Sequence, residues 1–178
     1  SQEFGVTPDI ITMAKATTNG VVPMGVVAVK EEIYDTVLDG SSAPEGTPEL
    51  FHGYTYSGIP VAVSAAIAVQ KIFEKEDIFN RVKKLSKYFE DGLHSLEDLS
   101  CVDSIRNYGL LGGIDISMRD KPGKAGFNVY KKCYDSGVNI KPTGDALIIA
   151  PPFICEKKHI DEIVDKMRLG IKNHLDAK

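Results

Sequence analysis

The order of apolar segments after Ser100 constrains the fold of this chain more than any other feature of its sequence. Short apolar runs rich in β-branched residues, which are typical of strands, alternate there with segments whose apolar residues recur every three or four positions, as on one face of a helix. The expected strands are residues 102–106, 110–117, 138–141 and 146–150, and the expected helices are residues 125–136 and the stretch after Pro152. This order predicts an α+β layer of three or four strands with two helices on one face.

The N-terminal part of the chain has the pattern of an α/β protein. The run Ile10–Ala14 predicts a buried strand, and residues 21–29 predict a second strand that Pro23 and Gly25 bend. A helix is expected at residues 31–38. A longer helix is expected from Pro60, and because small residues occur on all its faces, it should pack on several sides.

A further helix is expected after Asp77, which stands where a capping residue would stand. Its apolar residues follow a single stripe from Ile78 to Leu96. Residues 40–58 are rich in Gly, Ser and Pro, have no periodicity and form a long connection. Such a segment is typical of a surface loop with a function of its own.

Composition excludes several classes of function. Hydrophobic residues make up 43% of the 178, as in ordinary globular proteins, and 21 Lys and Arg against 25 Asp and Glu give a net charge of −4. We therefore expect no nucleic-acid-binding surface and no polybasic membrane anchor. The longest apolar stretches fall short of the roughly 18 residues of a membrane span.

Cysteine and histidine spacing argues against disulfides and metals. Cys101, Cys133 and Cys155 are an odd number of widely spaced residues without a CxxC pair, which favours buried structural thiols in a reducing, cytoplasmic setting. The four histidines have no metal-ligand spacing, so we expect no metal site.

Lys15 is the first candidate catalytic residue, because it directly follows the apolar run Ile10–Ala14. Burial disfavours a charged ammonium and lowers the pKa of lysine, and the neutral amine can then attack a carbonyl to form a Schiff base. The alternative is that Lys15 only extends its charge into water at the end of a strand. A lyase that forms a Schiff base without a cofactor is a further possibility, which depends on Lys15 alone.

Four segments, in order, resemble landmarks of one enzyme family. PDIITMAKATTNGVVPMGVVAV resembles the segment that carries the cofactor lysine in class III aminotransferases, and HGYTYSGIPVAVSAA resembles their next landmark. IRNYGLLGGIDI and GDALIIAPPF resemble strands of their C-terminal domain. The similarity extends from Gln2 to about Asn173. These are fold-type I pyridoxal-phosphate enzymes that include the ω-amino acid:pyruvate transaminases.

The resemblance implies roles for three residues. Lys15 is expected to hold pyridoxal 5'-phosphate as a Schiff base and then to move a proton between substrate and cofactor. Thr55 is expected to bind the cofactor phosphate of the neighbouring subunit, and Tyr54 to line that subunit's cofactor and substrate site, so a homodimer with shared active sites is expected. Without the resemblance, the favoured interpretation is that Ser57 or Thr55 only caps a helix and that the aromatic residues belong to a core.

Lys141 marks a departure from the family pattern. Many members have at this position an arginine that binds the carboxylate of the amino or keto acid. Lysine presents a point charge in place of a two-pronged donor, so carboxylate recognition should be weaker and the 2-oxo acid less certain. The alternative is a solvated lysine at a strand end.

Other parts of the family's cofactor site are absent from the sequence: a glycine-containing phosphate turn, an aromatic residue that stacks on the cofactor ring, and an aspartate that keeps the ring nitrogen protonated. We therefore expect a C-terminal piece of a fold-type I enzyme: the end of the large α/β domain (1–58), connecting helices (59–98) and a small α+β domain (99–178). The parent would exchange an amine or ω-amino acid with a small 2-oxo acid such as pyruvate. The alternative is a noncatalytic fragment or dimerisation module.

Overall fold

The computed structural model describes residues 2–40, 44, 52–117 and 123–176. The chain divides into two compact units, residues 1–76 and 77–178, and each is described by itself. The division lies inside the region that the sequence suggested as connecting helices. Much of the loop predicted at residues 40–58, namely 41–43 and 45–51, is outside the described residues.

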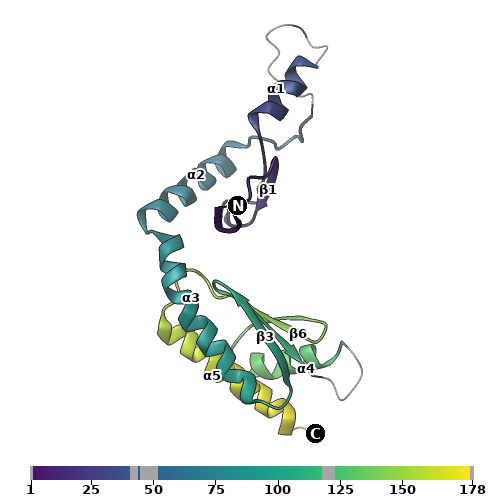
Figure 1. Ribbon diagram of the computed structural model, residues 1–178, viewed down its shortest axis with the longest axis vertical. Coiled ribbons are helices and arrows are strands. Elements are labelled where there is room, and N and C mark those ends of the chain that lie inside the picture. The colour runs from purple at the N-terminus through teal and green to yellow at the C-terminus, as the bar shows by residue number, and fades with distance from the viewer. Residues whose placement is uncertain (1, 41–43, 45–51, 118–122, 177–178) are drawn as a thin grey trace. The chain divides into compact units, whose positions relative to one another are not determined.

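The first unit combines a two-stranded sheet with two helices (Figure 1). Its elements are the 3₁₀ turn η1 (Gln2–Phe4), strands β1 (Ile10–Ala14) and β2 (Gly25–Val29), and helices α1 (Glu31–Asp39) and α2 (Pro60–Lys75). The strands are antiparallel, with Ile10 opposite Val29 and Ala14 opposite Gly25. β2 begins later than the apolar pattern suggests, because residues 15–22 form consecutive turns.

Two predictions of burial in this unit are wrong. β1 was expected to be buried, but four of its five residues are exposed, and 54% of the Ile10 surface is accessible. α2 was expected to pack on several sides, but its buried residues are only Ala62 and Val69. The physical reason is the same in both cases: a sheet of two strands covers little apolar surface, and four of the five residues of each strand remain exposed.

The second unit is a four-stranded antiparallel sheet with helices on one side (Figure 1). Its elements are α3 (Ile78–His94), η2 (Ser95–Asp98), β3 (Val102–Tyr108), β4 (Leu111–Ile116), α4 (Ala125–Asp135), β5 (Lys141–Thr143), β6 (Ala146–Ile149) and α5 (Lys157–Asp176). The strand order is β3-β4-β6-β5. Three helices contribute to the core, in place of the two expected, because the apolar stripe of α3 is buried as well.

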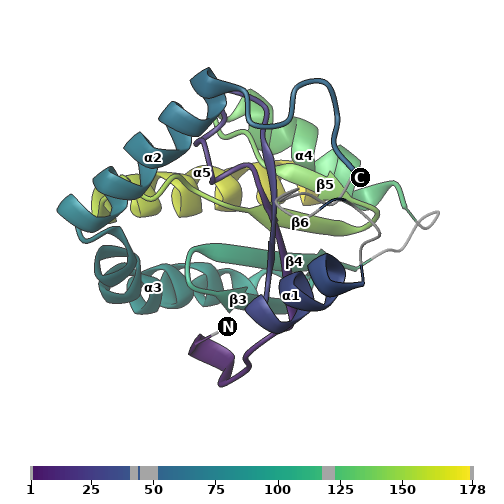
Figure 2. The same cartoon turned by 90° about the horizontal axis from the view of Figure 1, so that it is seen from above.

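The core of this unit lies between the sheet and its helices. Ile114 and Leu147 from the sheet, Phe89 and Leu93 from α3 and Ile160 from α5 are fully buried. α4 and α5 lie side by side (Figure 2). The three cysteines are buried thiols, as expected.

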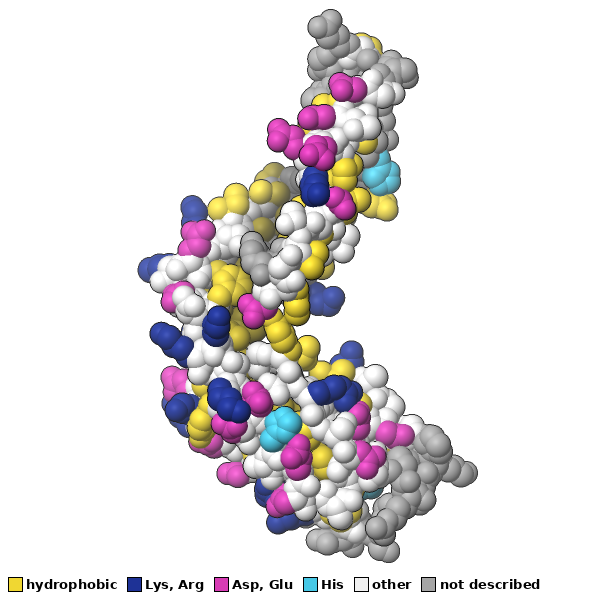
Figure 3. Space-filling view, viewed as in Figure 1, with side chains coloured by type: hydrophobic (Ala, Val, Ile, Leu, Met, Phe, Trp, Pro, Cys, Tyr) yellow, Lys and Arg dark blue, Asp and Glu magenta, His cyan; other side chains and the backbone are white. Residues whose placement is uncertain are grey.

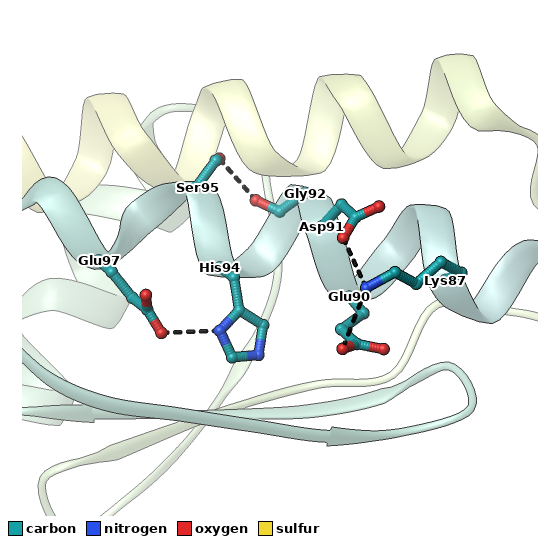
Figure 4. Close-up of polar contacts among 7 residues, drawn as sticks. All are labelled: Lys87, Glu90, Asp91, Gly92, His94, Ser95 and Glu97. Atoms are coloured by element: carbon teal, nitrogen blue, oxygen red, sulfur yellow. Dashed lines mark hydrogen bonds and ion pairs between the residues drawn. The ribbon is translucent and has the colours of Figure 1, made fainter.

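α3 shows how helical spacing separates the core from solvent. Its buried residues are Ile78, Leu85, Phe89 and Leu93, which recur at helical steps. The exposed side carries local polar contacts: Lys87 Nζ forms an ion pair with Asp91 at 2.9 Å, and His94 Nδ1 is hydrogen-bonded to Glu97 of η2 at 2.7 Å (Figure 4). Such exposed pairs contribute little to stability, so the helix depends on its apolar stripe.

Two details differ from the sequence-based expectations. Asp77 occupies the N-cap position of α3 but makes no capping side-chain bond; it has a left-handed φ of 49°, and its carboxylate accepts hydrogen bonds from the Asn80 side chain. The strand expected at residues 138–141 lies instead at Lys141–Thr143. Val138 and Ile140 are buried, but they follow the end of α4, where the Val138 N–H donates to the Cys133 carbonyl.

Charged side chains of both signs are intermixed on the face of the second unit in Figure 3. None of the helices in the described part of the chain is long and apolar enough to cross a membrane. The same described residues contain no group of three or more His, Cys, Asp or Glu side chains that could hold a metal ion.

Candidate active site

Lys15 directly follows β1 and has an unusual backbone conformation. Its φ is 60°, in the left-handed region that residues other than glycine rarely adopt. Its carbonyl accepts hydrogen bonds from the N–H groups of Thr18 and Gly20, both at 3.3 Å. Strained residues of this kind persist where the surrounding structure fixes them, and they cluster at functional sites. The turn therefore fixes the direction in which the lysine leaves the strand.

Thr17 and Thr18 lie in the turn after Lys15, and their hydroxyl groups differ in hydrogen bonding. Thr18 is 1% exposed, and its Oγ1 donates a 2.6 Å hydrogen bond to the carbonyl of Val22. Thr17 Oγ1 is buried and has no hydrogen-bond partner among the described residues. A buried hydroxyl without a partner is unfavourable, so Thr17 marks this turn as a place where the described structure leaves a polar group unsatisfied.

Lys15 itself is exposed. The expectation that an apolar strand shelters this amine from water is therefore wrong for the described residues. Strands β1 and β2 are themselves largely exposed, so they do not enclose the side chain at their end. The interpretation of Lys15 as a catalytic residue rests on its position and on family resemblance, and not on burial.

Tyr54 and Thr55 lie in a tight turn before α2. The Ser57 N–H donates to the Tyr54 carbonyl at 2.9 Å, and Ser57 Oγ accepts from the Tyr54 N–H at 3.0 Å. Both Tyr54 and Thr55 are exposed, with 81% of Tyr54 accessible. The aromatic residues of this segment are therefore not part of a core.

The N-terminus of α2 has no side-chain cap. Ile59 is its N-cap residue and Pro60 its first residue, so the interpretation of Ser57 or Thr55 as a helix cap is also wrong. Pro60 has no N–H, and the Ile59 and Ala62 N–H groups already donate to the carbonyls of Tyr56 and Ile59, so the positive end of the helix dipole is what favours an anion here. With the Thr55 hydroxyl just before it, this terminus has the donor types that a phosphate needs.

A hollow of about 590 Å³ lies between the two-stranded sheet and residues 52–59. Met13 and Met24 line it from the sheet side, and Tyr54, Tyr56 and Ile59 line it from the other side. Lys15 and Thr55 are not among the described residues of its wall. The structure thus places Tyr54 in a pocket but does not bring the three candidate residues of this unit together in one.

Lys141 belongs to the second unit, on the side of the sheet away from the helices. It is the first residue of β5 and pairs with Ile148, which pairs in turn with Gly113. Leu147 and Ile149 are buried against the helices, so Ile148 and its partner lie on the opposite face. Lys141 is exposed on this open face.

Arg106, on the opposite edge strand β3, lies in the same cross-strand row as Lys141, a relation that sequence reasoning missed. Its guanidinium binds both carboxylate oxygens of Asp115, and Ser104 Oγ donates to the same group at 2.7 Å. The hydrogen bonds from Arg106 and then from Ser104 hold the pKa of Asp115 below its usual value. Strict alternation along residues 104–108 would have placed Arg106 on this face.

The residue types present fit pyridoxal phosphate in part. Lys15 supplies an accessible primary amine for an aldehyde, and the uncapped terminus of α2 with Thr55 supplies donors for a phosphate. Neither group is enclosed by the described residues.

Comparison with known proteins agrees with this set of residues. Residues 1–171 match the family described as Aminotransferase class-III. An ω-aminotransferase of Caulobacter vibrioides is 44% identical over 169 residues, which are 94% of this chain and 38% of the relative. An ω-amino acid–pyruvate aminotransferase of Pseudomonas putida is 36% identical over 99% of this chain and 39% of its own length.

Solved structures give the same result. An (S)-enantioselective ω-transaminase from Thermomicrobium roseum is 29% identical, with a TM-score of 0.87 over 98% of this chain and 39% of that one. An adenosylmethionine-8-amino-7-oxononanoate aminotransferase from Methanocaldococcus jannaschii is 30% identical, with a TM-score of 0.84 over 94% of this chain and 39% of that one. The chain thus spans about two fifths of the length of these relatives. The family resemblance and the predicted fold class are confirmed: the chain belongs to the class-III aminotransferases and has the fold of the fold-type I transaminases.

Proposed function

We propose that this sequence acts within a pyridoxal-phosphate-dependent aminotransferase that exchanges an amine or ω-amino acid with a small 2-oxo acid such as pyruvate. One observation carries the proposal: in a member of the class-III aminotransferases, Lys15 directly follows strand β1 in a left-handed conformation fixed by a turn. The names of the Caulobacter and Pseudomonas relatives support the ω-amino donor.

Lys15 is the proposed catalytic residue. When bound, pyridoxal phosphate would supply an electron sink for the negative charge that remains after the substrate carbon loses a proton. The Lys15 amine would bind the cofactor aldehyde and, once released by the incoming amine, would accept that proton and deliver it to the aldehyde-derived carbon of the cofactor. Both tasks need a neutral amine in a dry site, so we propose that further protein surface covers Lys15 in the active enzyme.

Thr55 and Tyr54 are the proposed contacts to the cofactor bound by a second subunit. The uncapped N-terminus of α2 and the Thr55 hydroxyl would bind the phosphate, and Tyr54 would line the substrate space. This arrangement makes the enzyme a homodimer, because each site would use a loop of the other subunit. A cytoplasmic location is part of the same proposal.

Lys141 is the proposed partner of the substrate carboxylate. It is exposed on the open face of the second unit's sheet, where an ammonium group can approach an anion. A single ammonium orients a carboxylate less strictly than a guanidinium does. We therefore expect this enzyme to accept several small 2-oxo acids with modest affinity.

Mass spectrometry after borohydride reduction tests the role of Lys15. The complete enzyme is incubated with pyridoxal phosphate, reduced and digested, and the peptide that contains Lys15 should carry the mass of one reduced cofactor. Lys15→Arg should abolish this labelled peptide, whereas Lys30→Arg, a control in the same unit, should retain it. Labelling spread evenly over exposed lysines of the unsubstituted enzyme would contradict the proposal.

The alternative is a noncatalytic fragment or dimerisation module, and the buried core among the described residues of the second unit supports it for these 178 residues in isolation. We propose that the isolated chain is inactive, because it lacks the ring-binding aspartate and phosphate turn that the family resemblance assigns to other residues. The isolated chain should then bind cofactor without preference for Lys15. Thr55→Val in the complete enzyme should weaken cofactor retention, and Ser57→Ala should not; equal retention in the Thr55 variant would remove its assigned role.

A further inference from the structure

Strands β5 and β6 form a hairpin with a very short turn, and Lys141 is the first residue of β5. Thr143 pairs with Ala146, so only Gly144 and Asp145 form the turn. Gly144 has a φ of 57°, which glycine adopts without strain. β5 itself is a short edge strand with Pro142 at its centre, and among the described strands its one partner is β6. The position of this strand therefore depends on the turn.

Asp145 fixes the turn to the start of α4. Its Oδ2 accepts a 2.8 Å hydrogen bond from the Gly123 N–H, and its Oδ1 accepts a 3.1 Å bond from the Ala125 N–H. The N-cap residue of α4, Lys124, makes no capping side-chain bond. Asp145 thus performs the task of a cap from a distant part of the sequence, and its negative charge suits a helix N-terminus.

Two further contacts hold this turn in place. The Asp145 carbonyl accepts a 2.9 Å hydrogen bond from the Ile116 N–H, which ties the turn to β4. A Cβ atom on Gly126 would lie 2.3 Å from the Gly144 carbonyl oxygen, so the backbone of α4 packs directly on the turn. Asp145 therefore links α4, β4 and the hairpin, and the edge strand with Lys141 extends from this junction.

We infer that Asp145 is a positioning residue, which fixes β5 so that the Lys141 ammonium meets the carboxylate of the 2-oxo acid. The inference rests on the proposed function, in which Lys141 binds that carboxylate. Asp145 itself touches neither substrate nor cofactor in this assignment. Each of its carboxylate oxygens accepts a hydrogen bond at the start of α4, one from the Gly123 N–H and one from the Ala125 N–H.

The test compares two groups of ligands: propanoate and pyruvate, which have a carboxylate, and propanal, an acceptor that has no carboxylate. In the complete enzyme, the dissociation constant of propanoate, an unreactive analogue of pyruvate, is measured by ligand-observed NMR, and KM is measured for pyruvate and for propanal. Asp145→Ala should weaken propanoate binding and raise KM for pyruvate by roughly tenfold, the loss expected for one misplaced charged contact. KM for propanal should remain unchanged.

Three further variants separate positioning from a general structural role. Asp145→Asn keeps one oxygen acceptor, so it should retain more propanoate affinity than Asp145→Ala. Asp135→Asn, the same charge change at the exposed C-terminal end of α4, should have no effect. In a Lys141→Ala background, Asp145→Asn should cause no further loss, because the residue through which it acts is gone.

The outcomes distinguish a failure of the positioning role of Asp145 from a failure of the proposed aminotransferase function. If the unsubstituted enzyme transaminates neither acceptor, the proposed function fails and the inference falls with it. If transamination occurs but the Asp145 variants affect propanal as much as pyruvate, or remain additive with Lys141→Ala, only the inference is overturned. An unchanged propanoate affinity in folded Asp145→Asn, confirmed by its circular dichroism, also overturns it.

Discussion

The crossing of α4 and α5 gives the sharpest test of how the second unit is packed. A Cβ atom on Gly170 would lie 2.7 Å from both N and Sγ of Cys133 and 2.8 Å from its Cα. Real Cβ contacts do not occur at such distances, so the two helix backbones are in direct contact at this point. Gly170→Ala must therefore move one helix away from the other.

The magnitude follows from two opposing effects. Alanine is favoured over glycine inside a helix by about 1 kcal/mol. Overpacking of a dense core costs about 1–3 kcal/mol, and the upper part of this range applies because backbone atoms of Cys133 cannot rotate out of the way. We expect Gly170→Ala to lower the free energy of unfolding by about 1–2 kcal/mol, which corresponds to a Tm decrease on the order of 5–15 °C for a domain of this size.

Gly92→Ala is the matched control, because Gly92 also lies in a helix that faces α5. A Cβ there would meet only methyl groups, Cγ2 of Val164 at 3.2 Å and Cγ2 of Ile160 at 3.5 Å, which can shift slightly. The gain in helix propensity should offset this crowding and leave stability within about 1 kcal/mol of the unsubstituted chain. Urea unfolding followed by far-UV circular dichroism measures both variants, and a Gly170→Ala chain as stable as the Gly92→Ala chain would refute this account of the crossing.

Three other predictions concern charge, thiol chemistry and local stability. The pKa of Asp115 is lowered in the folded chain, so its contribution to stability is present above its unfolded pKa of about 3.9 and is lost as pH falls through the folded value. Asp115→Asn should therefore slightly reduce stability to urea at pH 7. A difference between the two chains that persists in strong acid would contradict this linkage. Burial raises the pKa of the Cys133 thiol to about 12, so iodoacetamide at pH 8 should modify this residue only after the chain unfolds. Peptide mapping measures the modification, and rapid modification of the native chain would disprove the burial of Cys133. Amide hydrogens of β4 and β6 should exchange more slowly than those of β1 and β2, because the former lie over a core and the latter are exposed; equal protection by mass spectrometry would argue against this contrast.

Local patterns identified most elements of the fold. β1 has the bounds that its apolar run suggested, and α2 begins at Pro60, whose fixed φ and missing N–H suit the first turn of a helix. The strand at residues 138–141 was misplaced for a physical reason. Val138 and Ile140 are buried beside the end of α4, and apolar residues that pack on a helix terminus have the same spacing as residues in a strand.

The geometry of the candidate site was harder to predict from the sequence than the fold was, because it depends on contacts between residues that are distant in the chain. The place of Lys141 on the open face follows from alternation along β6 and its register with β5. The attachment of Asp145 to the start of α4 could not be predicted in this way, since a cap supplied from the hairpin has no local sequence signal. The left-handed φ of Lys15 is likewise a property of the turn after β1, in which Gly20 and Thr18 bind its carbonyl.

The buried core that stabilises this chain and the residues proposed for catalysis lie in different units. In the described part of the first unit, the only buried hydrophobic residues are Ala62 and Val69, whereas the remaining core residues belong to the second unit. Lys15 and Thr55 thus lie on the part of the chain with the smaller core. A neutral lysine amine requires a dry environment, and the described residues around Lys15 do not provide one. The turn can fix the direction of the lysine by backbone hydrogen bonds alone, but exclusion of water needs apolar surface, so orientation of this amine and its desolvation must come from different parts of the enzyme.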